Sequence, residues 1–290
     1  MTVRAAGQRG RTGTAPAVTD PARIRNVVLV GPSGAGKTTL VEALLAHTGT
    51  IPRAGSVGDG STVCDHDAAA VRQERSVALA VAPMLQPGAE GDTKINLIDT
   101  PGYGDFVGEL RAGLRAADAA LFVVPASVGR EGAVDPAVVT QWEECAAVGM
   151  PRAVVITRCD HPRADLEATV TACQDVFGAG VAPLYLPLRT GDAVTGLYGL
   201  ISQTPDGAAP PDADDARAAL LEGIIEQSED ETLMERYLGG EEIDTATLID
   251  DLETAVARGS FHPVVPVCAM GGIGLDEPPG ELRLHRDHRE

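Results

Sequence analysis

The sequence predicts an α/β fold in which a mostly parallel sheet carries helices on both faces. Short apolar runs alternate with helical segments from residue 23 to about residue 180, a rhythm typical of parallel strands joined by helical crossovers. The first apolar run, "RNVVLVG", also leads through a glycine-rich turn straight into a helical segment. We therefore expect one domain over residues 23–275, between a disordered leader, 1–22, and a disordered tail, 276–290.

Strands and helices alternate through the regular part of the chain. We predict strands at "RNVVLVG", "KINLID", "AALFVV" and "RAVVIT", which cover residues 25–31, 94–99, 119–124 and 152–157. We predict helices at "GKTTLVEALLAHTG", "FVGELRAGLRAAD", "VVTQWEECAAVG" and "ADLEATVTACQDVFG", which cover residues 36–49, 106–118, 138–149 and 164–178. These pairs are the expected repeating units of the sheet.

The rhythm changes at about residue 181. The stretch "VAPLYLPLRTGDAVTGLYGLIS" is typical of a hairpin-like pair of strands, and acidic helical segments follow over 216–240 and 244–259. The run "HPVVPVCAMGGIG", 262–274, then has the composition of a core strand again. This order indicates an α+β subdomain, about 181–262, inserted into one domain rather than a second domain.

Composition excludes several function classes. The chain has 290 residues, 44% of them hydrophobic, and a formal net charge of -19, which argues against non-specific binding to a nucleic-acid backbone. No apolar stretch approaches the ~20 residues of a membrane span. The five cysteines form no CxxC pair, and "CDH" at 64–66 lacks a second ligand pair, so we expect reduced thiols in a cytoplasmic protein and no zinc site.

The segment "GPSGAGKT", residues 31–38, matches the phosphate-binding pattern G-x-x-x-x-G-K-[ST] between a strand and a helix. Glycines let backbone N–H groups converge on phosphate oxygens at the positive end of a helix. Lys37 is expected to neutralise the β- and γ-phosphates, and the Thr38 hydroxyl to bind Mg²⁺. The competing interpretation is a glycine-rich turn that only caps the helix.

A second segment, "DTPGYGDF", residues 99–106, follows the apolar run "INLI". An acid at this strand end, Asp99, can hold the metal ion through water. Gly102 can offer its backbone N–H to a γ-phosphate, and loss of that phosphate would release the loop. An ordinary Pro-Gly turn is the alternative, but the pairing with residues 31–38 favours a nucleotide switch.

Two later strand ends carry features that suit a guanine base. In "ITRCD", Asp160 can accept hydrogen bonds from N1–H and the exocyclic amine of guanine, which adenine does not offer, and Arg158 can stack on the base. In "VCAMGG", backbone N–H groups around Cys268 and Ala269 can face the guanine oxygen. Each segment alone is also compatible with a plain surface turn.

The order of these motifs resembles the G domain of translational GTPases, and of elongation factor G in particular, from about Arg25 to Gly274. The stretch "EQSEDETLMERYLGGEEI" resembles the acidic insertion of that factor. The resemblance implies a P-loop GTPase fold, GTP and GDP as ligands, Mg²⁺ as cofactor, and the ribosome as a partner. The family continues into further domains beyond this point, so we expect an isolated G domain that does not translocate alone.

The site residues follow from these motifs. Lys37, Gly102 and Tyr103 are the expected catalytic residues, and Thr38 and Asp99 the expected metal ligands. The residues expected to contact the nucleotide are Gly31, Pro32, Ser33, Gly34, Ala35, Gly36, Lys37, Thr38, Thr39, Asp99, Thr100, Pro101, Gly102, Thr157, Arg158, Cys159, Asp160, Cys268, Ala269 and Met270.

The sequence departs from the family pattern at four places. Tyr103 replaces the histidine that positions the attacking water, and a phenol with a pKa of ~10 is a poor base at neutral pH. The best match to the first switch, "RSVAL" at 75–79, places Ala78 where the family has a metal-binding threonine. Thr157 replaces the asparagine of the base-binding motif, and Gly34 replaces an acid associated with a monovalent cation.

Three functions are compatible with this pattern. The first is GTP binding with slow, Mg²⁺-dependent hydrolysis to GDP and phosphate, because positioning and electrostatics carry most of that reaction. The second is a module that binds and senses GTP without useful turnover, which Tyr103 and Ala78 favour. The third is an ATP-using P-loop enzyme such as a small-molecule kinase, against which Asp160 and the insertion argue.

Overall fold

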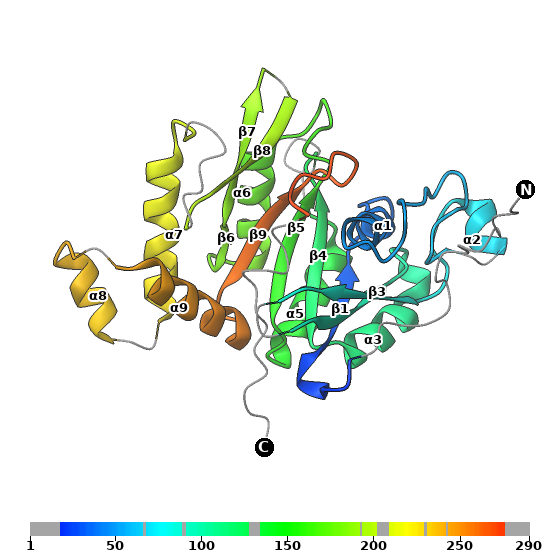
Figure 1. Ribbon diagram of the computed structural model, residues 1–290, viewed down its shortest axis with the longest axis horizontal. Helices are drawn as coiled ribbons and strands as arrows, with labels where there is room; N and C mark the ends of the chain where they lie inside the picture. The colour runs from blue at the N-terminus through cyan, green and yellow to red at the C-terminus, as the bar shows by residue number, and fades with distance from the viewer. Residues whose placement is uncertain are drawn as a thin grey trace, which may run out of the picture.

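A seven-stranded sheet forms the centre of the molecule in this computed structural model (Figure 1). The structure describes residues 18–65, 68–88, 91–127, 134–191, 193–201, 209–228, 231–241 and 243–275. The strands, in spatial order, are β2 (Ala80–Gln86), β3 (Thr93–Asp99), β1 (Ile24–Val30), β4 (Ala119–Pro125), β5 (Arg152–Thr157), β9 (His262–Val267) and β6 (Val181–Pro183). Only β2 runs antiparallel to its neighbour among these described strands.

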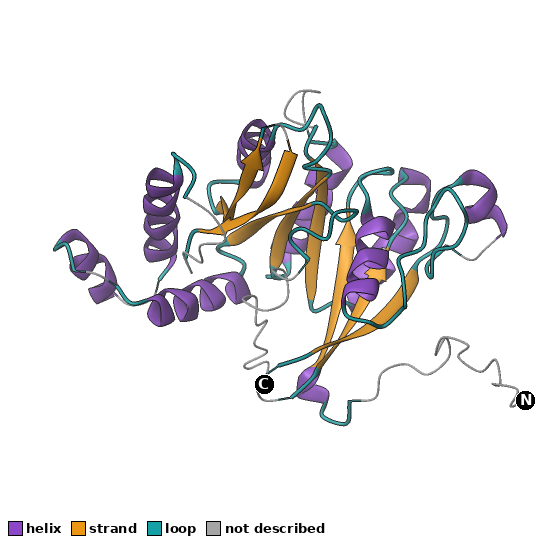
Figure 2. Cartoon of the chain, turned by 45° about the horizontal axis from the view of Figure 1, so that its top comes forward, coloured by secondary structure: helices purple, strands orange, loops and turns teal. Residues whose placement is uncertain are grey.

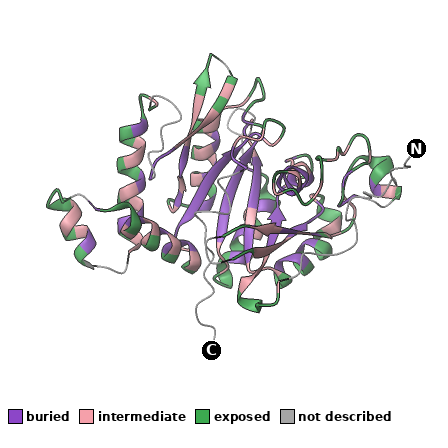
Figure 3. Cartoon of the chain, in the orientation of Figure 1, coloured by how far each residue is buried: buried purple, intermediate pink, exposed green. Residues whose placement is uncertain are grey.

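Helices cover both faces of this sheet, which confirms the predicted fold class. One face packs against α1 (Lys37–His47), α7 (Ala213–Gln227) and α9 (Thr245–Arg258). The other packs against α3 (Val107–Ala116), α5 (Pro136–Ala147) and α6 (Leu166–Phe177). The central strands are accordingly buried along most of their length (Figure 3). No described helix is long and apolar enough to span a membrane.

The segment after α6 contributes to the main sheet as well as to the hairpin. Strand β6 pairs with β9 at the sheet edge, whereas β7 (Tyr185–Thr190) and β8 (Ala193–Gly199) form a separate antiparallel pair (Figure 2). Helices α7 and α9 then cover one face of the sheet, and α8 (Glu231–Leu238) packs on them through a small apolar cluster that includes Ile225, Leu233 and Leu248. Part of the segment expected as an insertion therefore belongs to the layers of the main domain.

The edge strand β2 is absent from the sequence prediction. Pro83 lies in its middle, opposite Asn96 of β3, and proline is normally a reason to reject a strand. At the edge of a sheet a proline is tolerated, because only one side of the strand needs its N–H groups. The alternate residues Ala82 and Met84 are buried, so the strand still has an apolar face toward the core.

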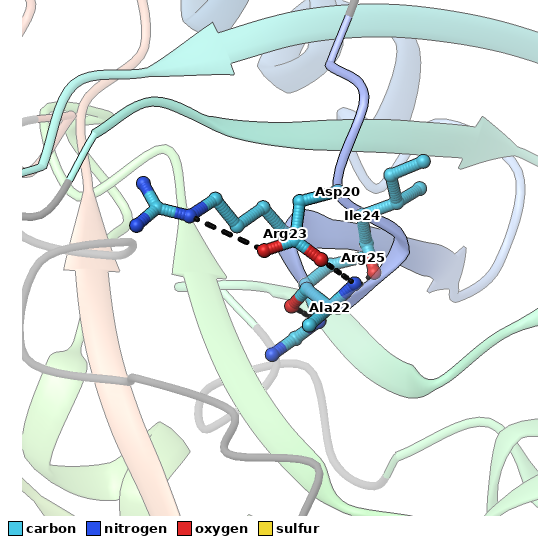
Figure 4. A network of polar contacts seen from close by, with 5 residues as sticks. All are labelled: Asp20, Ala22, Arg23, Ile24 and Arg25. Atoms are coloured by element: carbon cyan, nitrogen blue, oxygen red, sulfur yellow. Dashed lines mark hydrogen bonds and ion pairs between the residues drawn. The ribbon is translucent and has the colours of Figure 1, made fainter.

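The described chain begins with a polar network around Asp20, immediately before β1 (Figure 4). The Asp20 carboxylate accepts a hydrogen bond from the Ala22 N–H at 2.9 Å and caps a short 3₁₀ turn, η1 (Pro21–Arg23). Arg23 lies 3.7 Å from the same carboxylate, and Arg25 donates to the Ala22 carbonyl at 2.6 Å. Residues 18–22 therefore form an ordered lead into β1; the rest of the expected leader, 1–17, and the tail, 276–290, lie outside the described residues.

An aromatic cluster joins α5, α6 and the sheet beneath them. Trp142 stacks on Phe177 with ring centroids 4.2 Å apart, and it meets Phe122 and His262 edge-on. The Arg152 guanidinium lies 4.5 Å from the centroid of the Trp142 ring. Burial and the charge of Arg152 lower the pKa of His262 to about 4. His262 is therefore neutral in the folded protein at pH 7.

We expect His262 to make folding sensitive to mild acid. Between its unfolded pKa of ~6.5 and its folded pKa of about 4, only the unfolded chain binds the proton, so the free energy of unfolding falls as the pH drops. The loss approaches ~3 kcal/mol below pH 4. Urea unfolding at pH 7 and pH 5, followed by fluorescence of the single tryptophan, measures it. A His262→Gln variant should lose this part of the pH dependence, and an unchanged dependence would contradict the assignment.

Candidate functional site

The loop of residues 31–38 joins the end of β1 to the start of α1, as the sequence predicts. A Cβ at Gly31 would clash with the backbone oxygen of Val123 on the neighbouring strand, so the close approach of the two backbones requires glycine. Gly36 has a left-handed φ of 97° and precedes the first residue of α1. Ser33 and Gly34 are exposed, and the half-buried Thr39 follows in the first turn of α1. The loop therefore opens to solvent at the positive end of a helix.

Lys37 is buried beneath this loop. Its ammonium group donates to the carbonyl oxygens of Gly31 at 2.7 Å and Pro32 at 3.1 Å. An ammonium has three N–H donors, so these two carbonyls leave one donor for a further acceptor. Burial lowers the pKa of Lys37 to about 8, while the charges of Asp99 and Asp65 oppose that shift. The side chain is therefore still largely cationic at pH 7.

Thr38 and Asp99 meet at the end of β3. The Thr38 hydroxyl donates to Oδ2 of Asp99 at 2.6 Å. The other carboxylate oxygen of Asp99, Oδ1, is buried and has no hydrogen-bond partner among the described residues. Burial raises the pKa of Asp99 to about 6, although the Thr38 hydrogen bond and the Lys37 charge lower it. An unpartnered buried carboxylate oxygen beside a hydroxyl fits a hard cation, because Mg²⁺ prefers oxygen ligands.

The turn after β3 lies directly on the loop of residues 31–38. The Ser33 N–H donates to the Gly102 carbonyl at 3.1 Å, and a Cβ at Gly102 would clash with the backbone of Pro32 and Ser33. The Thr100 hydroxyl donates to the Leu29 carbonyl at 2.6 Å, so this side chain anchors the turn to β1. Pro101 is buried beside it. The two motifs found separately in the sequence are therefore one contiguous structure.

Tyr103 lies at the outer end of this turn, just before the 3₁₀ turn η2 (Gly104–Phe106). Its side chain is 39% exposed. The guanidinium carbon of Arg75 lies 4.8 Å from the centroid of the ring, within the range of a cation–π contact. Arg75 follows the short helix α2 (Ala68–Gln73), so the contact links the segment before β2 to the turn after β3.

The predicted base-binding residues lie at the ends of β5 and β9, which are adjacent parallel strands with Thr157 opposite Val267. The Thr157 hydroxyl donates to the Ala35 carbonyl at 2.6 Å and so ties this region to the loop of residues 31–38. Arg158 and Asp160 are exposed, and Arg158 has a left-handed φ of 59°. Both charged side chains are thus available at the surface next to the loop.

Two buried thiols join these strand ends. The Cys159 thiol donates to the Ile156 carbonyl at 3.3 Å. Interaction between the Cys159 and Cys268 thiols raises the pKa of Cys159 and lowers that of Cys268. The Cys268 N–H donates to the Ile273 carbonyl at 3.0 Å and closes the last loop. Within that loop Ala269 is half-buried and Met270 is 86% exposed. All four predicted segments, residues 31–38, 99–106, 157–160 and 268–270, therefore lie around one edge of the sheet.

Sequence reasoning missed two polar residues beside the predicted metal ligands. The Ser76 hydroxyl lies 3.2 Å from the Thr38 hydroxyl and donates to the Asp65 carboxylate at 3.2 Å. The match to the family's first switch placed Ala78 at the position of a metal-binding threonine. Ala78 is exposed, however, and the hydroxyl of this segment that lies beside Thr38 belongs to Ser76. The described residues contain no group of three or more His, Cys, Asp or Glu side chains that could hold a metal ion.

A buried acid, Glu42, supports the loop that carries Asp65. It lies on α1 and accepts hydrogen bonds from the backbone N–H groups of Gly55 and Val63. Because Glu42 is only 1% exposed, both N–H groups are satisfied inside the protein rather than by water. The segment between α1 and α2 is therefore fixed to α1 at two points. The glycine-rich composition of this segment gave no sign in the sequence that Glu42 holds it in place.

Comparisons with known proteins agree with this geometry. The elongation factor Tu GTP-binding-domain family matches residues 22–282. An elongation factor G-like protein of Mycobacterium tuberculosis, strain CDC 1551, is 57% identical over 276 residues, which cover 91% of this chain and 37% of that protein. The same protein of strain H37Rv gives the same values. The chain thus spans little more than a third of the curated relatives it matches.

A solved structure shows the same fold. The crystal structure of a protein from Thermus thermophilus superimposes with a TM-score of 0.76 at 37% sequence identity, over 88% of this chain and 39% of that chain. The family match therefore agrees with the order of the strands in the sheet and with the geometry of the phosphate-binding loop. The chain belongs to the elongation factor Tu GTP-binding-domain family, and it is similar to part of an elongation factor G-like protein.

Proposed function

We propose that the chain binds GTP and Mg²⁺ at the loop of residues 31–38 and hydrolyses the nucleotide slowly to GDP and phosphate. The observation that supports this most directly is that a buried ammonium, Lys37, and the hydrogen-bonded Thr38–Asp99 pair lie together beneath an open loop. A buried cation with a remaining donor suits phosphate oxygens. The Thr38 hydroxyl and the Asp99 carboxylate would hold the metal ion, which would supply charge neutralisation at the phosphates.

The Ser33–Gly102 hydrogen bond supports a switch in the turn after β3. A phosphate oxygen in the loop would compete with the Gly102 carbonyl for the Ser33 N–H. Once that carbonyl is displaced, the peptide can rotate and offer the Gly102 N–H to the terminal phosphate. Loss of the terminal phosphate would then favour the arrangement seen in this structure. The turn would in this way report which nucleotide is bound.

Slow turnover is proposed because of Tyr103. Its phenol is a weak base at neutral pH, and its ring is already in contact with the Arg75 guanidinium. Lys37 and the positive end of α1 would still stabilise charge on the phosphates, so some hydrolysis would persist. A module that binds GTP without useful turnover remains the second candidate. The exposed carboxylate of Asp160, next to the loop of residues 31–38, favours both GTP-binding candidates over an ATP-using kinase.

A ribosomal role for this chain is a proposal by analogy. The relatives are described as elongation factor G-like proteins, and the chain covers 37% of their length. We propose the ribosome as the partner and the cytoplasm as the location of the protein. Stimulation of hydrolysis by ribosomes is expected to be weak, because the side chain that would position water is Tyr103 rather than histidine.

Base selectivity is the first expectation. GTP should displace a fluorescent GDP analogue at concentrations at least about 100-fold lower than ATP, because Asp160 can pair with two donors of guanine only. Asp160→Asn should lose most of that preference, and Lys37→Ala should lose phosphate-dependent affinity for both nucleotides. Competition titrations against the fluorescent GDP analogue measure the affinities of wild type, Asp160→Asn and Lys37→Ala for both nucleotides. Equal displacement by ATP and GTP would instead revive the kinase interpretation.

Hydrolysis is the second expectation. Wild-type protein should release phosphate from GTP slowly but faster than the Lys37→Ala control, and Tyr103→His should be faster than wild type by about tenfold or more, in line with the usual contribution of a positioned acid–base group. Tyr103→Phe serves as the matched control, because it keeps the ring over Arg75 and removes only the hydroxyl. Single-turnover phosphate release is the measurement.

The outcomes of this experiment separate the two leading candidates. A wild-type rate no higher than that of Lys37→Ala would exclude hydrolysis and leave the binding module. An unchanged rate in Tyr103→His would show that the identity of this residue does not limit turnover.

A further inference from the structure

We propose that Ser76 is a ligand of the Mg²⁺ ion that accompanies the nucleotide, and that Asp65 is the residue that positions its hydroxyl. This inference rests on the proposed function, because it concerns the same cation site. It reassigns the metal contact of the first switch segment from position 78, which carries no hydroxyl, to a serine two residues earlier.

The hydroxyl oxygens of Thr38 and Ser76 lie close together. Ser76 Oγ lies 3.2 Å from Thr38 Oγ1. In an octahedral Mg²⁺ site with ligand distances of ~2.1 Å, two neighbouring ligands are ~3.0 Å apart. The two oxygens are therefore already spaced as adjacent ligands of one Mg²⁺ ion. They come from the first turn of α1 and from the segment between α2 and β2.

Each of these two hydroxyls has a carboxylate as acceptor for its proton. A hydroxyl has one proton, and Thr38 directs its proton to Asp99 at 2.6 Å. Ser76 directs its proton to Asp65 at 3.2 Å. Either hydroxyl could also donate to the other, but when both protons point to the carboxylates the contact between the two oxygens has no proton between them. Lone pairs that face each other in this way repel, and a cation placed between them relieves the repulsion.

The carboxylates beside the two hydroxyls carry charge inside the protein, away from solvent. Asp65 and Asp99 are both buried, with exposed fractions of 6% and 1%. Oδ1 of Asp99 is unpartnered among the described residues, and burying such an oxygen is costly. A divalent cation bonded to the two hydroxyls would compensate both acids. The site thus contains matched pairs, in which each ligating hydroxyl is oriented by its own carboxylate.

Hydrogen bonds hold Asp65 and its loop in place. Its backbone N–H donates to the Thr62 hydroxyl at 3.1 Å, and the preceding loop is fixed to α1 by Glu42. Arg75, next to Ser76, contacts the Tyr103 ring. A cation at Ser76 would therefore connect the segment before β2 with both the phosphate loop and the turn after β3. This is the coupling that a nucleotide sensor requires.

The test measures how Mg²⁺ slows release of a fluorescent GTP analogue from wild type, Ser76→Ala, Ser76→Thr and Asp65→Asn. In EDTA all four proteins should release the analogue at the same rate. At saturating Mg²⁺, Ser76→Ala should release it about tenfold faster than wild type, in the range found when support for a metal ligand is removed. Asp65→Asn should lose part of the effect, and Ser76→Thr should retain it because the hydroxyl remains.

A matched control is Ser56→Ala, which removes an exposed serine hydroxyl from the segment between α1 and α2 and should behave as wild type. Equal Mg²⁺ dependence in wild type and Ser76→Ala would overturn the inference and leave the proposed function intact. A change in Ser76→Ala of the same size in EDTA and in Mg²⁺ would also overturn it, because it would show a structural effect. Failure of wild type to bind the analogue at all would overturn the proposed function together with the inference.

Discussion

The hydrogen bond between the Thr38 hydroxyl and the Asp99 carboxylate, 2.6 Å long, is the contact on which the rest of the site depends. It joins the first turn of α1 to the last residue of β3. The parallel register that places Leu29 of β1 opposite Asp99 brings these two elements together. A buried carboxylate is tolerated there only because a hydroxyl and the Lys37 ammonium lie beside it. Strand register therefore sets the electrostatics of the site.

The remaining parts of the site follow from the same geometry. Parallel strands end at one edge of the sheet, so the loops after β1, β3, β5 and β9 converge there. The Thr157 hydroxyl then fixes the end of β5 to the loop of residues 31–38 through a hydrogen bond to the Ala35 carbonyl at 2.6 Å. The carbonyls around Lys37 take up two of its donors before any ligand arrives. Much of the binding geometry is therefore organised in advance, which lowers the entropic cost of binding.

The sequence predicted the parts of this arrangement that have a local pattern. The strand–loop–helix unit at 25–49 and the alternation along the chain indicated the fold class, which the structure confirms. Strand β2 was missed because Pro83 in its middle argues against a strand unless the strand is known to lie at a sheet edge. Ser76 was missed because its proposed role depends on a contact with Thr38, which is distant in the sequence. The contact between Arg75 and Tyr103 was hidden for the same reason. Spacing along the chain does not show which side chains meet in space.

A crystal structure of the chain with Mg²⁺ and a non-hydrolysable GTP analogue tests the central claim most directly. We expect the phosphates on residues 31–38, the base beside Asp160, and the Thr38 and Ser76 hydroxyls among the ligands of the metal ion. We also expect the Gly102 carbonyl to have left the Ser33 N–H. A nucleotide bound away from this loop, or a metal ion bound without the Thr38 and Ser76 hydroxyls while the Ser33–Gly102 hydrogen bond persists, would contradict this description of the site.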